Sequence, residues 1–463
     1  MQGRIDVANI LAHSAANAPG AMRRHLHPPL MRLLEMLGFD HEFTRGDGCH
    51  LWMKDGTRVL DCLAGFGAHL LGRNHPTVRD ALQQCLNVGS PGWIRMAPNG
   101  LAAEAARRLK EACGRPEDLV YFANSGTEAV EAAIKFARRH TGRSGVIGWQ
   151  DGFHGFTLGS LSASGVAGLA EGFGALLPDS HSVPFGDLDA VQRLVSRGGI
   201  AAMIIEPIQG KTLRALAPGS MRSLHDICKR HGTLLIADEV QTGVGRTGTF
   251  LACSHDGVEP DLVTLSKGLS GGFVPVASVL VRPHIWRSTF DGMERAFVHS
   301  STHHESPLAM MALIATLQVV EAENLVERSR QLGDRLMSSL RKSLTGCDAA
   351  PEVRGRGLML GVALDAETVP SLRGIPLIED WTAPMVGQAL VMDLLREELV
   401  LAQVTETRKP VLKLLPALVL QDSDASTIEA AVPRAVRRLA DGSARKAIAS
   451  AATALLRSRL RMW

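Results

Sequence analysis

Short apolar runs alternate with helical patterns through the middle of the chain. Apolar positions at helical spacing predict helices over residues 127–141 and 219–231. Unbroken apolar runs predict strands over 119–123, 145–149, 200–206, 233–239, 262–266 and 276–281. This alternation is typical of an α/β fold, in which a mostly parallel sheet is covered by helices.

A second region with its own pattern follows the last of these strands. Pro307 begins a long apolar helical stretch, and residues 353–364 and 411–420 predict further strands. A chain of 463 residues is long enough to bury a large core and to form two domains. We therefore expect a large domain built on the parallel sheet and a smaller domain after it.

The composition is that of a globular protein, with 45% hydrophobic and 21% charged residues. No apolar run approaches the length needed to cross a bilayer, and no secretory signal is visible near the N-terminus. The seven cysteines are scattered and odd in number, which predicts reduced thiols and a cytoplasmic location. The net charge of +3 gives no reason to expect a nucleic-acid partner.

Two charged residues stand where predicted buried strands end. Asp238 lies at the end of one apolar run, and Lys267 lies where another runs into glycine. A buried lysine and a buried carboxylate are costly unless something occupies the space between them. Pyridoxal 5′-phosphate (PLP) needs this pair, because a lysine holds it as a Schiff base and a carboxylate keeps its ring nitrogen protonated. For these two residues alone, a salt bridge or a surface lysine is an equal alternative.

A turn that suits a phosphate group precedes the first predicted helix. Ser125 and Thr127 can cap the helix, and the free backbone N–H groups at its start, including that of Gly126, can bind an anion. An ordinary capped helix is the alternative. Together with Asp238 and Lys267, the turn favours a phosphate-bearing cofactor.

A competing motif occurs at Gly243–Gly248, which fits the dinucleotide fingerprint G-x-G-x-x-G. That fingerprint requires a helix immediately afterwards, so that the helix start meets the pyrophosphate. Residues 249–253 show no helical face, and Pro260 follows closely. We therefore expect a loop here rather than a nicotinamide site.

Five motifs, in order, make the chain resemble the class III PLP-dependent aminotransferases, which include ornithine, acetylornithine, 4-aminobutyrate and putrescine enzymes. They occur at 124–133, 152–155, 206–210, 237–248 and 266–268. The resemblance implies fold type I, with a seven-stranded, mostly parallel sheet in a large domain and a smaller α+β domain. We expect 1–90 to contribute to the small domain and the dimer interface, 91–325 to form the large domain, and 326–463 to form the C-terminal small domain.

The resemblance also assigns roles around the cofactor. Lys267 and Asp238 are the expected catalytic residues, since the lysine binds the cofactor and moves a proton while the aspartate pairs with the ring nitrogen. Gln241 is assigned to the ring hydroxyl, and Val240 and Phe153 are assigned to the two ring faces. Gly126 and Thr127 are assigned to the phosphate, with Ser125 and His154 as further cofactor-binding residues. Thr302 matches a threonine that reaches the phosphate from a neighbouring subunit, which implies a homodimer.

Substrate specificity is expected where the chain departs from its relatives. Lys413 stands where many relatives have an arginine that clamps a carboxylate, and a lysine is a poorer clamp because it is a point charge. The glycine-rich continuation after the 206–210 motif is replaced by residues 211–214. Glu206 and His303 are further expected substrate residues. The departures argue against a simple ornithine or 4-aminobutyrate enzyme, and residues 63–67 and 72–76 resemble a subgroup that aminates the aldehyde ends of larger molecules. The resemblance therefore implies the aldehyde end of a larger molecule or a diamine-type compound as acceptor.

Several alternatives stay open at this point. The histidines at 299, 303 and 304 with Glu305 suggest a metal site, but we expect none because the stretch precedes the helix rather than lying in it. The basic segment from Ala444 to Trp463 has a helical pattern that suits either an anionic membrane surface or, more simply, packing on the small domain. The leading function is a transaminase acting on an amino donor and a carbonyl acceptor. An aminomutase or epimerase, or a non-catalytic PLP-binding protein, are alternatives.

Overall fold

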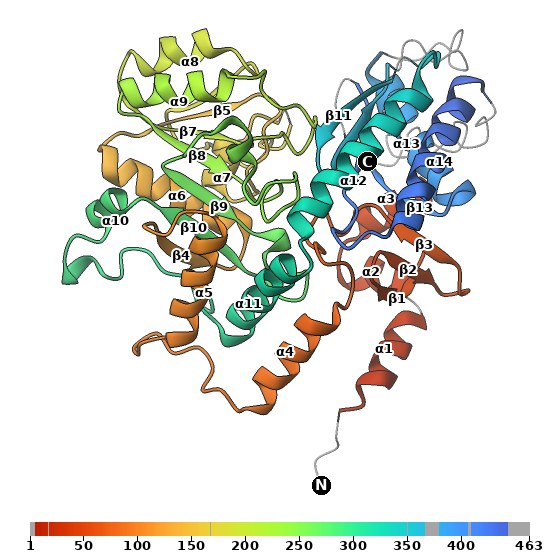
Figure 1. Cartoon of the computed structure of the whole chain (residues 1–463), viewed down its shortest axis with the longest axis horizontal. Helices are drawn as coiled ribbons and strands as arrows, with labels where there is room; N and C mark the ends of the chain where they lie inside the picture. The colour runs from red at the N-terminus through yellow and green to blue at the C-terminus, as the bar shows by residue number, and fades with distance from the viewer. Residues whose placement is uncertain are drawn as a thin grey trace.

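The computed structural model describes residues 5–16, 18–166, 168–349, 351–365, 379–405 and 409–442. Its centre is a seven-stranded sheet in the order β4-β10-β9-β8-β7-β5-β6, shown in Figure 1. The strands are β4 (Leu119–Ala123), β5 (Gly145–Trp149), β6 (Ser180–Val183), β7 (Ile200–Ile205), β8 (Leu234–Asp238), β9 (Leu262–Leu265) and β10 (Ala277–Val281). Only β10 runs antiparallel to its neighbours, which confirms the predicted mostly parallel sheet.

Helices cover both faces of this sheet, which is why its strands are apolar without alternation. In β7, Ala202 and Ile204 belong to the core that contains α6 (Gly126–Thr141), while Met203 and Ile205 belong to the core on the other face. The other helices around the sheet are α5 (Gly100–Ala112), α7 (Leu158–Ala163), α8 (Leu188–Val195), α9 (Ser220–Arg230) and α10 (Pro283–Thr289), while α4 (Pro76–Asn87) packs on α11 (Pro307–Ala322). Short 3-10 helices occur at Ala252–Asp256, Lys267–Ser270 and Met293–Arg295.

Two four-stranded sheets lie beside this large layer. One has the order β1-β2-β3-β13, from β1 (Phe43–Asp47), β2 (His50–Met53), β3 (Arg58–Asp61) and β13 (Val400–Leu401). The other has the order β11-β12-β15-β14, from β11 (Glu352–Arg356), β12 (Met359–Ala363), β14 (Gln403–Thr405) and β15 (Val411–Leu414). The predicted strand over 353–364 is thus two antiparallel strands that turn at Gly357, whose φ is +54°. The parallel pairing of β3 with β13 joins the two ends of the chain.

The predicted helical stretch after Pro307 is divided into α11 (Pro307–Ala322) and α12 (Leu325–Leu344), which meet at 61°. The bend coincides with Asn324, which adopts a left-handed φ of +48°. The remaining helices are α1 (Val7–Ala16), α2 (Ala18–His25), α3 (Pro28–Leu37), α13 (Glu379–Glu397) and α14 (Asp422–Ala440). Within the described ranges no single helix has the length and apolarity to cross a membrane; α11 and α12 pass that test only as a bent pair.

The basic C-terminal segment is described only in part. Arg434 is paired with Glu398, and Arg438 is paired with both Asp393 and Glu398, so these cations pack α14 against α13 and the residue after it. The predicted helix from Ala444 to Trp463 lies outside the described residues.

Candidate active site

A cavity of about 660 Å³ opens at the carboxyl edge of the central sheet. It is reached by the loops that follow five parallel strands of the central sheet, β4, β5, β7, β8 and β9. Residues 65–66 and the β14 and β15 side of the sheet β11-β12-β15-β14 also line it. Ligands of open α/β sheets bind outside the carboxyl ends of the strands, so this cavity is the expected place for a cofactor. It brings together Gly126, Thr127, Phe153, His154, Glu206, Asp238, Val240, Gln241, Lys267 and Lys413.

Asp238, the last residue of β8, is buried and held on both oxygens. Its Oδ2 accepts a hydrogen bond from His154 Nδ1 at 2.7 Å. Its Oδ1 accepts from Thr264 Oγ1 at 3.0 Å and from the Val240 N–H at 3.1 Å. Three donors fix the orientation of this carboxylate at the cavity wall.

His154 titrates under two opposed influences. Burial alone lowers its pKa, but the hydrogen bond to Asp238 and the charges of Asp238 and Glu206 outweigh burial, so the pKa of His154 is raised. The raised pKa favours the protonated imidazole, which pairs with the Asp238 carboxylate inside the protein.

Lys267 follows β9, the parallel neighbour of β8, and so lies at the same edge of the sheet as Asp238. Its backbone has a left-handed φ of +43°, which aims the residue away from the strand direction. Burial lowers the pKa of the Lys267 amine, while the charges of Asp238 and Glu206 oppose that shift. Its ammonium makes no hydrogen bond with any residue in the described part of the chain. An uncommitted buried amine facing a held carboxylate has the donor set that PLP requires.

The space between the two has walls suited to a flat ring and a phosphate. A methyl group on Gly126 would lie only 2.9 Å from Val240 Cγ1, so the start of α6 packs tightly on the valine side chain. Ser125 caps α6 through the Glu128 N–H at 3.4 Å and does not line the cavity. The Thr127 hydroxyl bonds Ser160 Oγ at 2.7 Å and Thr157 Oγ1 at 2.8 Å, which leaves backbone N–H groups as the anion donors. The residues present fit PLP.

A hydrogen-bond network on the substrate side was not foreseen from the sequence. The Lys413 ammonium donates to the Gly210 carbonyl at 2.6 Å and to Gln241 Oε1 at 2.7 Å. Gln241 Nε2 donates in turn to the Phe66 carbonyl at 3.0 Å. Burial, with help from the charge of Lys267, lowers the pKa of Lys413 to about 7. Lys413 thus lines the cavity but already has two acceptors, and its role toward a substrate stays a prediction.

Glu206 supports the same network. Its Oε2 accepts from the Phe153 N–H at 2.9 Å, and its Oε1 accepts from the Gly210 N–H at 2.8 Å. Burial raises the pKa of Glu206, the nearby charge of His154 opposes this, and that of Asp238 adds to it. The carboxylate therefore links the loop after β5 to the loop after β7.

Two predicted site residues lie away from the cavity of their own chain. The Thr302 side chain is exposed, and its carbonyl accepts from Asn124 Nδ2 at 2.8 Å beside the start of α6. His303 is exposed and lies against Trp93, with ring centroids 5.7 Å apart. Both roles stay predictions, and that of Thr302 requires a second copy of the chain. Among the described residues no three His, Cys, Asp or Glu side chains are arranged to hold a metal ion.

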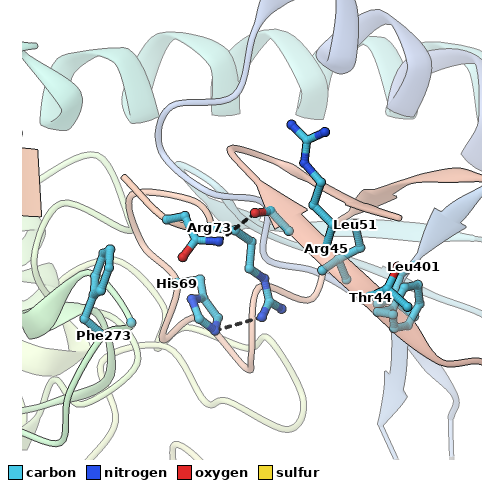
Figure 2. Close-up of a pocket in the computed structure, with 11 residues that line it drawn as sticks. Thr44, Arg45, Leu51, His69, Arg73, Phe273 and Leu401 are labelled. Carbon is cyan, nitrogen blue, oxygen red and sulfur yellow. Dashed lines mark hydrogen bonds between the residues drawn. The ribbon is translucent and has the colours of Figure 1, made fainter. Parts of the chain in front are cut away.

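A second cavity, of about 400 Å³, is lined by His69, Arg73 and Phe273 together with Thr44 and Arg45 of β1 (Figure 2). Arg73 donates to His69 Nε2 at 3.0 Å and forms a two-pronged pair with the buried Asp61, so its cation is already matched. The other oxygen of Asp61 accepts from the N–H groups of Leu63 and Ala64. This cavity therefore lies beside the Asp61–Arg73 pair, which fixes the backbone at Leu63 and Ala64, and the charge of Arg73 is not free to bind a ligand.

The Gly243–Gly248 stretch is a loop, as expected, and a 3-10 helix over Ala252–Asp256 follows it. Arg246 within it is buried and donates to the Leu358 and Pro416 carbonyls. The Arg246 side chain therefore connects this loop, which follows β8, to the sheet β11-β12-β15-β14.

Comparison with known proteins agrees with this geometry. The sequence model of the family Aminotransferase class-III matches residues 35–436. Acetylornithine aminotransferase of Methanopyrus kandleri is 40% identical over 68% of this chain and 79% of its own. Aminotransferase PigE of Serratia sp. is 36% identical over 77% of this chain, which spans only 42% of that longer protein.

Solved structures give the same result. Ornithine aminotransferase of Toxoplasma gondii superposes with a TM-score of 0.82 at 26% identity, covering 95% of this chain and all of that one. An amine transaminase of an uncultivated Pseudomonas species, solved with PLP bound, has a TM-score of 0.77 at 28% identity, covering 86% of this chain and 95% of that one. The chain therefore belongs to the class III aminotransferases, which are fold type I enzymes that depend on PLP. The relatives above are all aminotransferases, so nothing supports the aminomutase or epimerase alternative.

Proposed function

We propose that this aminotransferase moves an amino group from an amino acid or amine donor to the aldehyde end of a larger molecule. The composition of the cavity wall is the observation that supports this choice of acceptor. Three phenylalanines, Phe66, Phe153 and Phe156, line the cavity, and no arginine does among the described residues. Phe66 and Phe156 are 49% and 70% exposed, so they form an apolar entrance suited to an extended acceptor.

The residues divide the chemical work. When bound, PLP supplies the carbonyl that accepts the amino group and a ring that draws electrons from the substrate. We assign Asp238, held by His154 and Thr264, to keep the ring nitrogen protonated. Lys267 Nζ takes the proton from the substrate Cα, and burial, which lowers the pKa of this amine, favours the neutral form that can accept a proton. We assign Val240 and Phe153 to the two ring faces, the start of α6 to the phosphate, and Gln241, held in place by Lys413, to the ring hydroxyl.

We also propose that the enzyme is a homodimer in which Thr302 of the second copy completes the phosphate site. Support comes from apolar side chains left exposed on two neighbouring segments, 86–96 and 293–298, which meet where Arg95 stacks on Phe297 at 5.0 Å. They include Val88, 82% exposed, and Met96, 81% exposed. Burying such side chains between copies is favourable.

Two coarser expectations are retained as proposals. The domain division at about residues 90 and 325 is supported by the pairing of β3 with β13, which places the N-terminal segment with the C-terminal part. A cytoplasmic location is supported by the seven cysteines, all of them free thiols.

The acceptor proposal is tested with enzyme converted beforehand to its pyridoxamine phosphate form. Single-turnover rates are compared for linear aldehydes of increasing chain length and for 2-oxoglutarate. We expect the rate constant divided by the dissociation constant to rise with each added methylene, up to about fourfold per group. A flat series, or a preference for the shortest aldehyde, would show that the apolar entrance does not select the acceptor.

A further inference from the structure

Most charged groups that line the cavity are already committed. Asp238 accepts from three donors, and Glu206 accepts from two backbone N–H groups. Lys413 is buried and donates to two acceptors, and Lys267 is reserved for the cofactor carbonyl. A substrate carboxylate therefore needs a different cation.

Lys211 is the cavity-lining cation that has no such commitment. It is half-buried at the wall, and it makes no hydrogen bond or ion pair with any residue in the described ranges. It stands where the chain departs from the glycine-rich continuation of its relatives. Cationic side chains that line a largely apolar cavity without a partner are suited to bind an anionic part of a ligand.

The backbone under Lys211 is rigid, so the ammonium is presented from a fixed point. Residues 208–215 form a turn closed by two backbone hydrogen bonds. The Gln209 N–H donates to the Arg214 carbonyl, and the Leu213 N–H donates to the Gln209 carbonyl. Leu213 is 1% exposed in a core with Ile208 and Met359, and Gly210 is held on both sides by Glu206 and Lys413. Only the lysine side chain itself has to be ordered when a ligand binds, which limits the entropic cost.

We propose that Lys211 binds the carboxylate of the amino acid substrate and so determines which donors the enzyme accepts. This inference rests on the proposed transaminase function and assigns its specificity to a residue outside the catalytic pair. Because an ammonium is a point charge with rotatable donors, it tolerates carboxylates that approach from different angles. Donors that differ in the distance between amine and carboxylate are therefore all expected to use it.

The first test measures binding without turnover. Glutarate, which has carboxylates but no amine, is titrated into the PLP-loaded enzyme by calorimetry. Lys211→Met should weaken glutarate binding roughly tenfold, as expected for one partly desolvated ion pair. Lys211→Arg should restore most of the binding, and higher salt should narrow the gap between wild type and Lys211→Met.

A matched control lies on the same turn. Arg214 is exposed, stacks over Phe185 at 4.5 Å, and does not line the cavity. Arg214→Met removes the same unit of charge, so glutarate binding by this variant should stay within about twofold of wild type. An equal loss in both variants would show that general electrostatics, and not Lys211, attracts the anion, which would overturn the proposal.

Kinetics separate this inference from the proposed function. Lys211→Met should raise the KM for glutamate roughly tenfold and leave turnover of 1-aminobutane, which has no carboxylate, within about twofold. If wild type transaminates glutamate and Lys211→Met does so with the same KM, the Lys211 assignment fails while the function stands. If wild type transfers no amino group from any donor, the function itself fails. The PLP content of Lys211→Met should equal that of wild type; loss of PLP would instead place Lys211 at the cofactor phosphate and overturn the proposal.

Discussion

The carboxylate of Asp238 illustrates how single residues set the chemistry of the cavity. Its three donors come from the loop after β5, from β9 and from its own loop, so several elements converge on two oxygen atoms. In our proposal, replacing Asp238 with alanine removes the counter-charge that keeps the ring nitrogen protonated. We expect the barrier to rise by about 3 kcal/mol or more, a loss of roughly a hundredfold in single-turnover rate.

Thr264→Val is the graded comparison for this prediction. It deletes one neutral hydrogen bond to Asp238 Oδ1 and leaves the carboxylate and His154 in place. The rate should fall by about tenfold or less. Two variants of equal activity would mean that the carboxylate has another function.

Lys267→Ala should abolish transamination and leave PLP bound non-covalently. The lysine supplies the covalent link and the proton transfer, whereas Asp238 and the start of α6 supply contacts elsewhere in the cavity. Dialysis followed by measurement of retained PLP tests the binding, and a coupled assay tests the turnover. Turnover by the alanine variant near the wild-type rate would refute the assignment of Lys267.

The lowered pKa of Lys413 predicts a pH-dependent stability. In the folded chain Lys413 loses its proton near pH 7, whereas in the unfolded chain it keeps it to about pH 10. Between about pH 7 and pH 10 the unfolded chain therefore holds one more proton on Lys413 than the folded chain does. The free energy of unfolding of wild type, compared with that of Lys413→Met, should rise across this range by about 1.4 kcal/mol per pH unit. Denaturant unfolding of both proteins without PLP at pH 6.5, 7.5 and 8.5 measures this difference. A constant difference would place a water-exposed ammonium at this position.

At this scale the sequence predicted that Asp238 and Lys267 meet in one cavity, which the structure shows, but it did not predict their surroundings. Asp238 and Lys267 each end a continuous apolar run inside a family motif, and such local signals are readable. The partners of Lys413 lie 203 and 172 residues away in the chain, and no local pattern records contacts of that range.

Among the elements, the start of α6 packs closely against a residue of the cavity wall. A methyl group on Gly126 would approach two carbons of Val240, at 2.9 and 3.2 Å. Gly126→Ala should therefore push the helix start from the valine and weaken PLP affinity by roughly tenfold or more. Val240→Ala in the same chain should recover part of the loss.

Gly100 provides the matched control, because it also begins a helix directly after its cap residue. A methyl group on Gly100 would meet no atom within 4 Å. Gly100→Ala should leave PLP affinity, measured by fluorescence titration, unchanged. Equal losses in the two alanine variants would indicate a general effect on helix starts rather than a fitted ring site.

Elements with unbroken apolar runs were predicted well, because strands buried on both faces carry a strong signal. The strand β6 was missed, since its sequence Ser-His-Ser-Val has only one buried residue. The strands β1, β2 and β3 have four or five residues each with mixed polarity. β1, β2 and β3 pair with one another, but β3 also pairs with β13, more than 300 residues later, and that contact is a tertiary property.

For the whole molecule, the exposed apolar segments predict association. Val88→Glu places a charge in the patch that we assign to the dimer interface, where burial of the charge is costly. Light scattering should show a dimer for wild type and a larger share of single chains for the variant, with weaker PLP binding because Thr302 of the second copy is withdrawn. Leu119→Glu, at an exposed site on the edge strand β4, is the control and should stay dimeric. A fully active single-chain wild type would contradict the shared site.

The central claim is that this cavity transfers an amino group to bound PLP through Lys267 and Asp238. The most direct measurement mixes the PLP-loaded enzyme with glutamate alone and quantifies the products after one turnover. We predict one equivalent of 2-oxoglutarate and one of pyridoxamine phosphate per chain in wild type, and neither in Lys267→Ala. The same mixing is repeated with each of a set of other amine donors. Recovery of unchanged PLP and unchanged donor from wild type in every case, glutamate included, would contradict the account.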